Sequence, residues 1–295
     1  MRAARLHEIG GTPQVDEVDE PRSGDLLDVA VVGLNPVDIT IGNGRFYGGV
    51  PETPYVIGSE AVVTTADGRR LWYYGRGLMA ERIAIDSPRH AVEVPGGVSD
   101  ELAAACGVAG LTGWLAVSWR ARVTSDDTVL VLGASGSLGG TAVQGAKLLG
   151  AKRVIGAARR TENVPPEADE VVQIDGSETY PAATVIVDGL WGEPIERALA
   201  AAANGVRVVQ LGQSAGPAAT LQSGWVRGKV ANILGHALHQ TPHDVFAAGY
   251  CELAAHARDG RIRYQVETYS LERIAEAWER QASGSPGAKI VISVG

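Results

Sequence analysis

The sequence predicts an α/β fold in which a doubly wound parallel sheet follows a mainly β, loop-rich segment. Before Leu102, short β-like stretches are separated by Gly, Pro and Asp, as in antiparallel domains. After Leu102, strand-like and helix-like segments alternate, which is typical of parallel strands joined by helical crossovers. The stretch Val129–Ala151 is the clearest example, because an apolar strand turns through small residues into a helix.

The composition is that of a globular protein with a substantial core. Of 295 residues, 45% are hydrophobic and 20% charged, with a net charge of −8. This acidity argues against nucleic acid or an anionic membrane as the main partner. The longest uncharged run, Leu102–Trp119, holds three glycines and makes a poor membrane span. Two cysteines and an N-terminus without an apolar core lead us to expect a cytoplasmic protein.

The expected elements follow in chain order. The first domain has four strand-like runs, Val29–Gly33, Glu60–Thr64, Arg70–Tyr74 and Ala80–Ile85. The parallel sheet is expected from six, Thr128–Leu132, Arg153–Ala157, Glu170–Ile174, Thr184–Val187, Val206–Leu211 and Ala231–Leu238. The last segment is interpreted as a return to the first domain, with helices Asp244–Arg258 and Leu271–Gln281 and a strand Lys289–Val294.

The turn after Leu132 is predicted to bind a dinucleotide. Gly136 lets the backbone approach a pyrophosphate, Gly139 lets the helix pack closely on the strand, and amides at the helix N-terminus favour phosphate charge. Ala134 replaces the usual first glycine, so the alternative is that the glycines merely form a tight turn. The cofactor residues predicted here are Ala134, Ser135, Gly136, Ser137, Leu138 and Gly139.

The end of the second parallel strand indicates which nucleotide binds. An NAD site favours an acidic residue there, but this chain has Arg159 and Arg160, whose guanidinium groups can pair with a 2′-phosphate. NADPH is therefore the expected cofactor, although a solvated arginine pair is the alternative. Leu211 and Gly212, which end the fifth strand, are also assigned to the cofactor site.

Six segments resemble the medium-chain dehydrogenase/reductase superfamily, and its zinc-independent quinone oxidoreductase branch in particular. In chain order they are GLNPVDITIGNGRFY, PYVIGSEAVV, AAACGVAGLTGWLAV, VLVLGASGSLGGTAVQGAKLLGA, ADEVV and GAKIVISV. The resemblance implies a GroES-like catalytic domain, residues 1–106 and 240–295, with a Rossmann domain, residues 107–239, inserted between its two parts. It also implies that the sixth strand, Lys229–Gly235, pairs with its twin in a homodimer.

The resemblance also bears on zinc. Zinc-dependent members place a Cys early in the chain and a His in a Gly-His-Glu triplet, whereas this chain has Leu34-Asn35-Pro36 and Gly58-Ser59-Glu60. Cys106 alone cannot complete a tetrahedral site, and Pro242 interrupts the spacing of His236, His239 and His243. No metal is therefore expected.

The resemblance implies the catalytic residues. Asn35 is the counterpart of an asparagine near nicotinamide and substrate, Tyr47 and Tyr55 are expected to supply hydroxyl donors, and Thr112 to contact the nicotinamide ribose. Each has a structural alternative: Asn35 precedes a proline in a turn, and loop tyrosines often cap a core. Glu60 is interpreted as an ion-pair partner.

Three classes of function remain open at this stage. The first is an NADPH-dependent reductase of a quinone or enone, in which the small-molecule acceptor is already electrophilic. The second is an enoyl-thioester reductase, for which Arg45, Arg76 and Arg82 are candidate phosphate contacts. The third is a non-catalytic nucleotide-sensing protein, favoured by the short segment TENVPPE, whose prolines prevent a helix where the superfamily normally has one.

Overall fold

The structure is a computed structural model that describes residues 1–22, 24, 26–85, 88–284 and 286–295. The chain forms two compact units. Unit 1 contains Met1–Ala109, Tyr250–Gly260 and Tyr264–Gly295, and unit 2 contains Gly110–Gly249 and Arg261–Arg263. The division into compact units does not test the domain boundaries predicted from the sequence, which stay a prediction.

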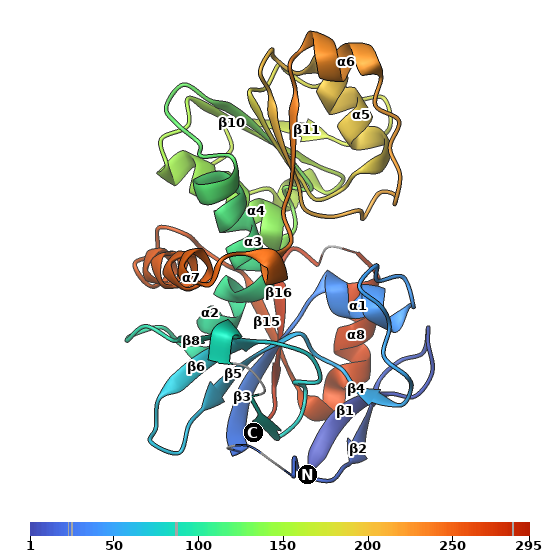
Figure 1. The fold of residues 1–295 in the computed structure, drawn as a ribbon, viewed down its shortest axis with the longest axis vertical. Helices are drawn as coiled ribbons and strands as arrows, with labels where there is room; N and C mark the ends of the chain where they lie inside the picture. The colour runs from blue at the N-terminus through green and yellow to red at the C-terminus, as the bar shows by residue number, and fades with distance from the viewer. Residues whose placement is uncertain (23, 25, 86–87, 285) are drawn as a thin grey trace. The chain divides into compact units, whose positions relative to one another are not determined.

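Unit 2 is built on a six-stranded parallel sheet, drawn from green to orange in Figure 1. Its order is β11-β10-β9-β12-β13-β14, so the strand order reverses between β9 and β12 as in a doubly wound sheet. The predicted fold class is thereby confirmed. The strands are β9 (Thr128–Leu132), β10 (Arg153–Ala158), β11 (Glu170–Gln173), β12 (Val185–Asp188), β13 (Arg207–Gln210) and β14 (Asn232–Gly235).

Burial explains why these segments are continuous apolar runs. In β9 every residue after Thr128 is buried, and all four residues of β12 are buried, because parallel strands are covered on both faces. The helices of unit 2 include α3 (Leu111–Leu115), α4 (Ser137–Leu148), α5 (Gly192–Ala201) and α6 (Ser223–Gly228), with short helical turns η3 (Ala116–Arg120), η4 (Thr161–Asn163) and η5 (Leu238–Gln240).

Unit 1 contains two sheets. The larger follows the order β15-β16-β3-β5-β6-β8, and β7 also pairs with β3; the smaller has the order β2-β1-β4. Figure 1 shows blue N-terminal and red C-terminal strands in the larger sheet. The strands are β1 (Arg2–Leu6), β2 (Gln14–Glu17), β3 (Leu26–Leu34), β4 (Tyr55–Val56), β5 (Glu60–Thr64), β6 (Arg70–Tyr74), β7 (Arg82–Ala84), β8 (Ala91–Glu93), β15 (Val266–Ser270) and β16 (Lys289–Ser293).

The helices of unit 1 include α1 (Pro36–Gly42), α2 (Asp100–Ala105) and α8 (Ile274–Ala282), with short turns η1 (Pro88–His90), η2 (Cys106–Gly110) and η6 (Leu271–Arg273). Helix α7 (His243–Arg258) begins in unit 2 and ends in unit 1. Among the described residues, one helical stretch, Asp100–Arg120, is long and apolar enough to cross a membrane by length and composition. Its most apolar window is 72% buried inside the protein, as in the core helix of a globular fold.

The last predicted parallel strand is shorter than expected. It was predicted over Ala231–Leu238, but β14 ends at Gly235 and the chain turns into η5 at Leu238. The prolines of TENVPPE act as predicted, since only η4 forms between β10 and β11. Val164 from this segment fills the space beside Gly156, where a Cβ would lie 2.6 Å from its Cγ1.

Candidate functional site

Unit 1 carries a candidate site of its own, which begins at the N-terminus of α1. Asn35 is the N-cap residue with extended backbone, and Pro36 follows at the first helical position, where its missing amide costs nothing. The backbone amide of Asn35 donates a hydrogen bond to Oδ2 of Asp38 at 2.8 Å. This local pattern fixes both side chains at the end of β3.

Asn35 belongs to a buried polar cluster with Glu60 and Lys289. Its Nδ2 donates to Oε1 of Glu60 at 2.8 Å, and the Lys289 ammonium donates to Asn35 Oδ1 at 2.6 Å and to Glu60 Oε1 at 2.7 Å. The Lys289 and Glu60 side chains are only 2% and 0% exposed. The ion pair expected for Glu60 is therefore present, and both ends of the Asn35 amide are engaged inside it.

The second oxygen of Glu60 is held by two donors from other segments. Trp72 Nε1 donates to Oε2 at 2.9 Å and the backbone amide of Val108 at 2.6 Å. Gly107 makes the close approach possible, since a Cβ there would overlap this oxygen. A buried carboxylate is tolerable only when its lone pairs are satisfied in this way.

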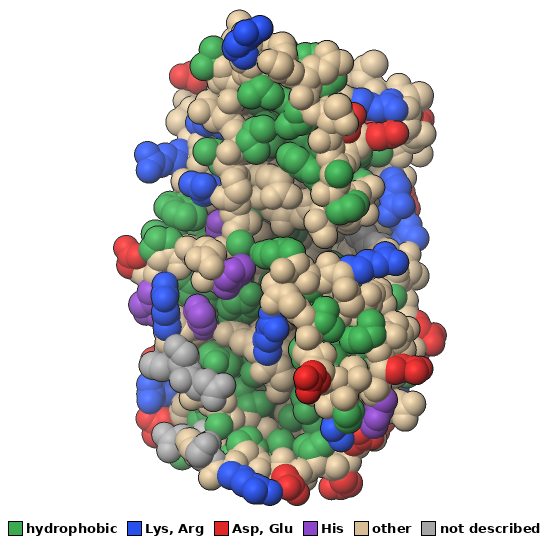
Figure 2. Space-filling view, turned by 45° about the vertical axis from the view of Figure 1, so that its right-hand side comes forward, with side chains coloured by type: hydrophobic (Ala, Val, Ile, Leu, Met, Phe, Trp, Pro, Cys, Tyr) green, Lys and Arg blue, Asp and Glu red, His purple; other side chains and the backbone are tan. Residues whose placement is uncertain are grey.

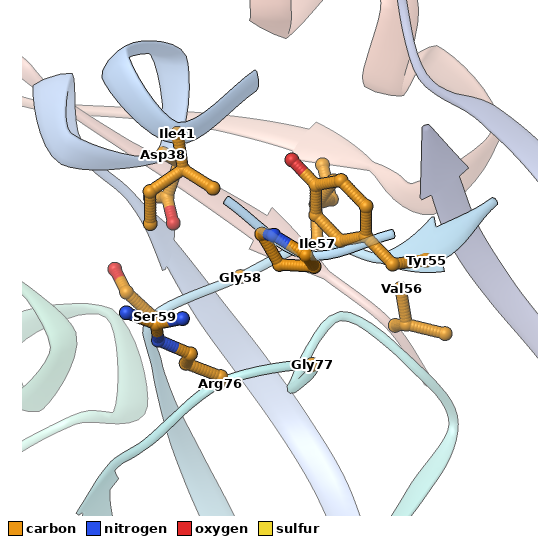
Figure 3. Close-up of a pocket in the computed structure, with 10 residues that line it drawn as sticks. Asp38, Ile41, Tyr55, Val56, Ile57, Gly58, Ser59, Arg76 and Gly77 are labelled. Atoms are coloured by element: carbon orange, nitrogen blue, oxygen red, sulfur yellow. The ribbon is translucent and has the colours of Figure 1, made fainter. Parts of the chain in front are cut away.

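A small cavity lies beside the cluster. It has about 30 Å³ of space, enough for a water molecule or two, and its walls include Asp38, Tyr55, Ser59 and Arg76. In the view of Figure 3, the Arg76 side chain extends toward Ser59, and the Tyr55 hydroxyl is turned toward α1. That hydroxyl is buried and has no hydrogen-bond partner, which leaves it available as a donor.

Burial controls the acid–base properties of this cavity. It raises the pKa of Asp38 to about 7, against the lowering effect of the Asn35 amide, Ser59 and Lys289. Burial, followed by the nearby Asp38 carboxyl, also raises the pKa of Tyr55. Asp38 is therefore a carboxyl that can hold or release a proton near neutral pH, and Tyr55 stays protonated there.

The structure separates the two predicted tyrosines. Tyr55 lines the cavity, whereas Tyr47 is 74% exposed, packs on the neighbouring Phe46 at 4.8 Å and is not part of the cavity wall. Sequence reasoning missed Asp38 and Lys289. The Asn-Pro-x-Asp spacing, which places an acid at the third helical position, is a signal that identifies Asp38.

Unit 2 carries a separate candidate site, the turn from β9 to α4. The amides of Gly133 and Ala134 both donate to the Ala157 carbonyl, at 2.9 and 3.0 Å, which ties the turn to the end of β10. Gly136 is the N-cap of α4 and has no side-chain cap. The first amides of α4 consequently have no intrahelical acceptor and are suited to an anion.

Close packing explains the small residues of this turn. A Cβ on Gly139 would overlap the carbonyl oxygen of Gly133 and lie 2.8 Å from the Ala134 Cα. A Cβ on Gly113, next to the buried Thr112, would overlap the carbonyl of Leu138 in the same way. The turn therefore has the backbone cradle that a nucleotide pyrophosphate requires.

The other predicted cofactor residues lie in the turn after β9 or at the carboxyl ends of β10 and β13, which are strands of the same parallel sheet. Arg159 and Arg160 follow β10 and are exposed, while Ser135, Ser137 and Leu138 are half-buried within the turn and first helical residues. Leu211 and Gly212 follow β13, where the Leu211 amide donates to the Asp188 carbonyl at 2.8 Å. Ligands of doubly wound sheets bind at this edge, so the residues of unit 2 fit a dinucleotide.

Comparisons with known proteins agree with this geometry. Residues 149–292 match a family model described as zinc-binding dehydrogenase. The chain is 27% identical to human quinone oxidoreductase, with 99% of this chain and 98% of that protein covered. The structure of the quinone oxidoreductase from Thermus thermophilus, also determined in complex with NADPH, superimposes with a TM-score of 0.82 at 26% identity, and both chains are fully covered.

Over nearly its whole length the chain is similar to quinone oxidoreductases of the medium-chain dehydrogenase/reductase superfamily. It is also 28% identical to a phenolphthiocerol/phthiocerol polyketide synthase protein of Mycobacterium tuberculosis. That match covers all of this chain but spans only 14% of the much longer synthase protein. The resemblance drawn from the six sequence segments is thus confirmed at the level of the superfamily.

In this chain, the residues at the positions where zinc ligands are expected make other contacts. Asn35 and Ser59 belong to the cluster and cavity of unit 1, and burial raises the pKa of the nearby Cys106 thiol to about 12, which disfavours the thiolate that zinc requires. Burial lowers the pKa of His236 to about 4. Throughout the described ranges, no group of three or more His, Cys, Asp and Glu is arranged to hold a metal ion.

Proposed function

We propose that the protein is an NADPH-dependent, zinc-independent reductase that transfers hydride to a quinone or an activated enone. The observation that carries the proposal is the buried, unpartnered hydroxyl of Tyr55 in a cavity walled by Asp38 and Ser59. The names of the human and Thermus relatives support the substrate class, and the backbone cradle of unit 2 supports a dinucleotide.

The residues of unit 1 suit reduction of a conjugated carbonyl. A bound reduced nicotinamide supplies hydride. The Tyr55 hydroxyl can donate a hydrogen bond to the carbonyl oxygen of the acceptor, where negative charge develops. Asp38, with a pKa of about 7, can supply a proton near neutral pH, and Ser59 shares its hydrogen-bond network. We assign Asn35 a positioning role, since its amide is held by Lys289 and Glu60, and Tyr47 a contact at the exposed rim.

The preference for NADPH rests on the end of β10. Arg159 and Arg160 are exposed and follow the strand tied to the turn that we propose holds the pyrophosphate, and Ala157 and Ala158 precede them where an acid would repel a 2′-phosphate. We assign Thr112, the turn from Ala134 to Gly139, Leu211 and Gly212 to the remaining contacts of the same cofactor.

The proposal that the enzyme does not need zinc rests on the residues that occupy the positions of zinc ligands in zinc-dependent members. The Lys289 ammonium lies 2.6 Å from Asn35 Oδ1 and brings a positive charge into this region. A hydroxyl at Ser59 replaces the imidazole of the zinc-dependent triplet. Elemental analysis of purified protein tests this proposal. Stoichiometric zinc, together with activity that a chelator abolishes, would contradict it.

An enoyl-thioester reductase is the second candidate. The match of the whole chain to a segment of a polyketide synthase favours it, because polyketide chains are carried as thioesters. It uses the same hydride transfer and the same hydroxyl donor, but it requires a surface that receives the thioester arm.

Steady-state NADPH oxidation with quinones, enones and enoyl thioesters tests these proposals together. A quinone or enone turned over with at least tenfold higher kcat/KM than any thioester supports the first candidate, and the reverse order supports the second. No oxidation with any acceptor, despite NADPH binding measured by fluorescence, indicates a nucleotide-sensing protein. The variant Tyr55→Phe is expected to lower kcat about tenfold or more, since one hydrogen bond to the developing oxyanion is lost.

We also propose a cytoplasmic homodimer that acts on small molecules. Cys106 and Cys251 are both free thiols, which suits a reducing compartment. On the face drawn in Figure 2, basic and acidic side chains are both spread over the surface, which gives no basic stripe suited to nucleic acid on that face.

A further inference from the structure

Arg76 stands at the border between two hollows of unit 1. It lines the small cavity with Asp38, Tyr55 and Ser59, and it also lines a broad surface hollow formed mainly by the segments around Glu17–Arg22 and Leu78–Ala84. The two hollows share Val56, Arg76 and Gly77 as wall residues. Arg76 therefore borders both the outer hollow and the cavity.

Charge pairing distinguishes Arg76 from the other arginines of the hollow. Arg5 pairs with Asp16, Arg22 with Asp19, and Arg82 with Glu20. Within the described ranges no carboxylate forms an ion pair with Arg76; its neighbours are the carbonyl of Gly48, at 3.5 Å, and the ring of Phe46. The hollow thus presents one cation whose charge the protein itself does not neutralise.

Aromatic packing holds this guanidinium in place. Its central carbon lies 5.5 Å from the centroid of the Phe46 ring, and Phe46 packs in turn on Tyr47 at 4.8 Å. Stacking on an aromatic face leaves the edge of the guanidinium and its N–H donors free for a planar or tetrahedral anion. The side chain of Arg76 is exposed, so its guanidinium is accessible to an anion while the ring contact and the Gly48 carbonyl limit its orientations.

We propose that Arg76 binds an anionic group, a carboxylate or a phosphate, carried by the acceptor whose reducible carbonyl enters the cavity beside Tyr55. The proposal rests on the proposed reductase function and names its substrate class: acceptors that bear a negative charge at the end remote from the reacting carbonyl. Of the three arginines considered from the sequence, Arg45 lines neither hollow and Arg82 lines only the outer one, where Glu20 neutralises it.

A matched pair of acceptors tests this. With 1,4-naphthoquinone-6-sulfonate, whose charge lies on the ring that carries no carbonyl, Arg76→Gln is expected to raise KM about tenfold more than it raises KM for uncharged 1,4-naphthoquinone, because a charge-assisted hydrogen bond is lost. The control Arg22→Gln removes an arginine of the same hollow that is 89% exposed and paired with Asp19, and it is expected to leave both values unchanged. Equal effects of Arg76→Gln on the two quinones overturn the proposal.

Two further experiments identify the source of the anion and distinguish failure of this proposal from failure of the proposed reductase function. The first compares crotonyl-pantetheine with its 4′-phosphate, which distinguishes the phosphate of a carrier from a free carboxylate or sulfonate. If the protein prefers the phosphorylated thioester and Arg76→Gln abolishes that preference, the anion is the phosphate of the carrier. Calorimetric titration of the sulfonated quinone into the protein with NADP⁺ reports on Arg76 even if no acceptor is reduced. Binding that is weakened about tenfold by Arg76→Gln supports the anion contact when turnover fails, and unchanged binding rejects it.

Discussion

At the scale of single residues, the buried ion pair of Lys289 with Glu60 organises the core of unit 1. The sequence predicted a partner for Glu60, but it gave no local sign that the partner lies 229 positions away. The pairing depends on the antiparallel register of β16 against β3, in which Ile290 lies opposite Leu34. That register places Lys289 beside Asn35, and no sequence window contains both residues.

Replacing Lys289 by Met is predicted to destabilise unit 1 strongly. The substitution leaves Glu60 as a buried charge without its cation, and breaking such a pair costs about 3–5 kcal/mol. Urea denaturation measures the change. The control Arg69→Met removes an exposed partner of Asp67 and is expected to change stability little, because solvent already screens that pair. Equal changes for the two variants contradict a structural role for the buried pair.

Asp188 is predicted to make stability depend on pH. Its Oδ1 accepts from the amides of Leu190 and Trp191, both at 2.9 Å, while Oδ2 is buried without a partner. Burial raises its pKa to about 6 from 3.8. The folded state therefore binds the carboxyl proton of Asp188 more tightly than the unfolded state does. The protonated carboxyl stabilises the folded state below pH 4, and this stabilisation is lost as the pH rises toward 6.

The variant Asp188→Asn isolates this effect. It keeps an acceptor for the two amides but cannot ionise, so the unfolding free energy of the parent should fall relative to the variant between pH 4 and pH 6. The change expected from the two pKa values is about 3 kcal/mol. Parallel stability curves for parent and variant over this interval contradict the prediction.

At the scale of elements, the strand–turn–helix of the proposed nucleotide site was the most predictable feature. Its determinants are local: the apolar run of β9, the small residues of the turn and the apolar face of α4 follow one another in the chain. Strands β1, β2 and β15 were missed for the opposite reason. Charged residues interrupt their apolar pattern, as in RAARL and QVDE, and their pairing partners come from distant segments.

The sequence around each tyrosine likewise did not predict which of the two side chains is exposed. Tyr47 and Tyr55 were treated alike from the sequence, but only Tyr55 begins a strand, β4, which pairs with β1 and places its ring over the cavity. Tyr47 lies in a loop where no such pairing exists in the described structure, and its side chain is exposed. Which loop residue faces a cavity depends on pairings that form only in the folded unit.

The turn provides a sharp pair of glycine variants. Gly139→Ala places a Cβ on the Gly133 carbonyl and is predicted to displace the turn and weaken NADPH binding at least tenfold. At the adjacent Gly140 a Cβ would lie 3.5 Å from Pro165 Cγ and 3.7 Å from the Ala134 carbonyl, which are ordinary contacts, so Gly140→Ala should bind normally. Fluorescence titration compares them, and equal affinities contradict the assigned role of Gly139.

Cofactor preference is predicted to reside in the residues after β10. Arg159→Asp replaces an exposed guanidinium with a carboxylate that repels a 2′-phosphate and accepts from ribose hydroxyls. We expect NADPH affinity to fall by roughly ten- to a hundredfold and the preference over NADH to be lost or reversed. Dissociation constants for both nucleotides decide this, and equal values in the parent protein contradict the preference.

At the scale of the whole molecule, the two ends of the chain meet in one sheet. β16 pairs antiparallel with β3 and parallel with β15, so the C-terminal segment completes a sheet begun near the N-terminus. Local patterns predicted strands at Val29–Gly33 and Lys289–Val294 but not that they pair, and the resemblance to a known superfamily implied that the last segment returns to the first domain. Long-range order of this kind is not written into any single segment.

The parallel sheet leaves one edge strand, β14, whose only strand partner in the described part of the chain is β13. Ile233 on this strand is 41% exposed, and the preceding Val230 is 71% exposed. The amide of Asn232 donates to the carbonyl of Val206 at 2.8 Å and that of His236 to the carbonyl of Gln210 at 3.0 Å, so by the alternation of a parallel ladder the amide of Ile233 faces outward. Apolar side chains beside unpaired amides form an edge that a second copy can extend.

The last prediction is that two copies join through β14 about a two-fold axis, as the resemblance implies. Ile233→Lys places a charge on the edge and should convert the dimer to a monomer near 30.8 kDa by light scattering at micromolar concentration. Val171→Lys makes the same change on β11 at the opposite edge, where the side chain is 45% exposed, and should leave the dimer intact. Ile233→Pro removes only an outward amide, so it should separate the copies without breaking the ladder to β13. A parent protein that already runs at the mass of one chain refutes the interface.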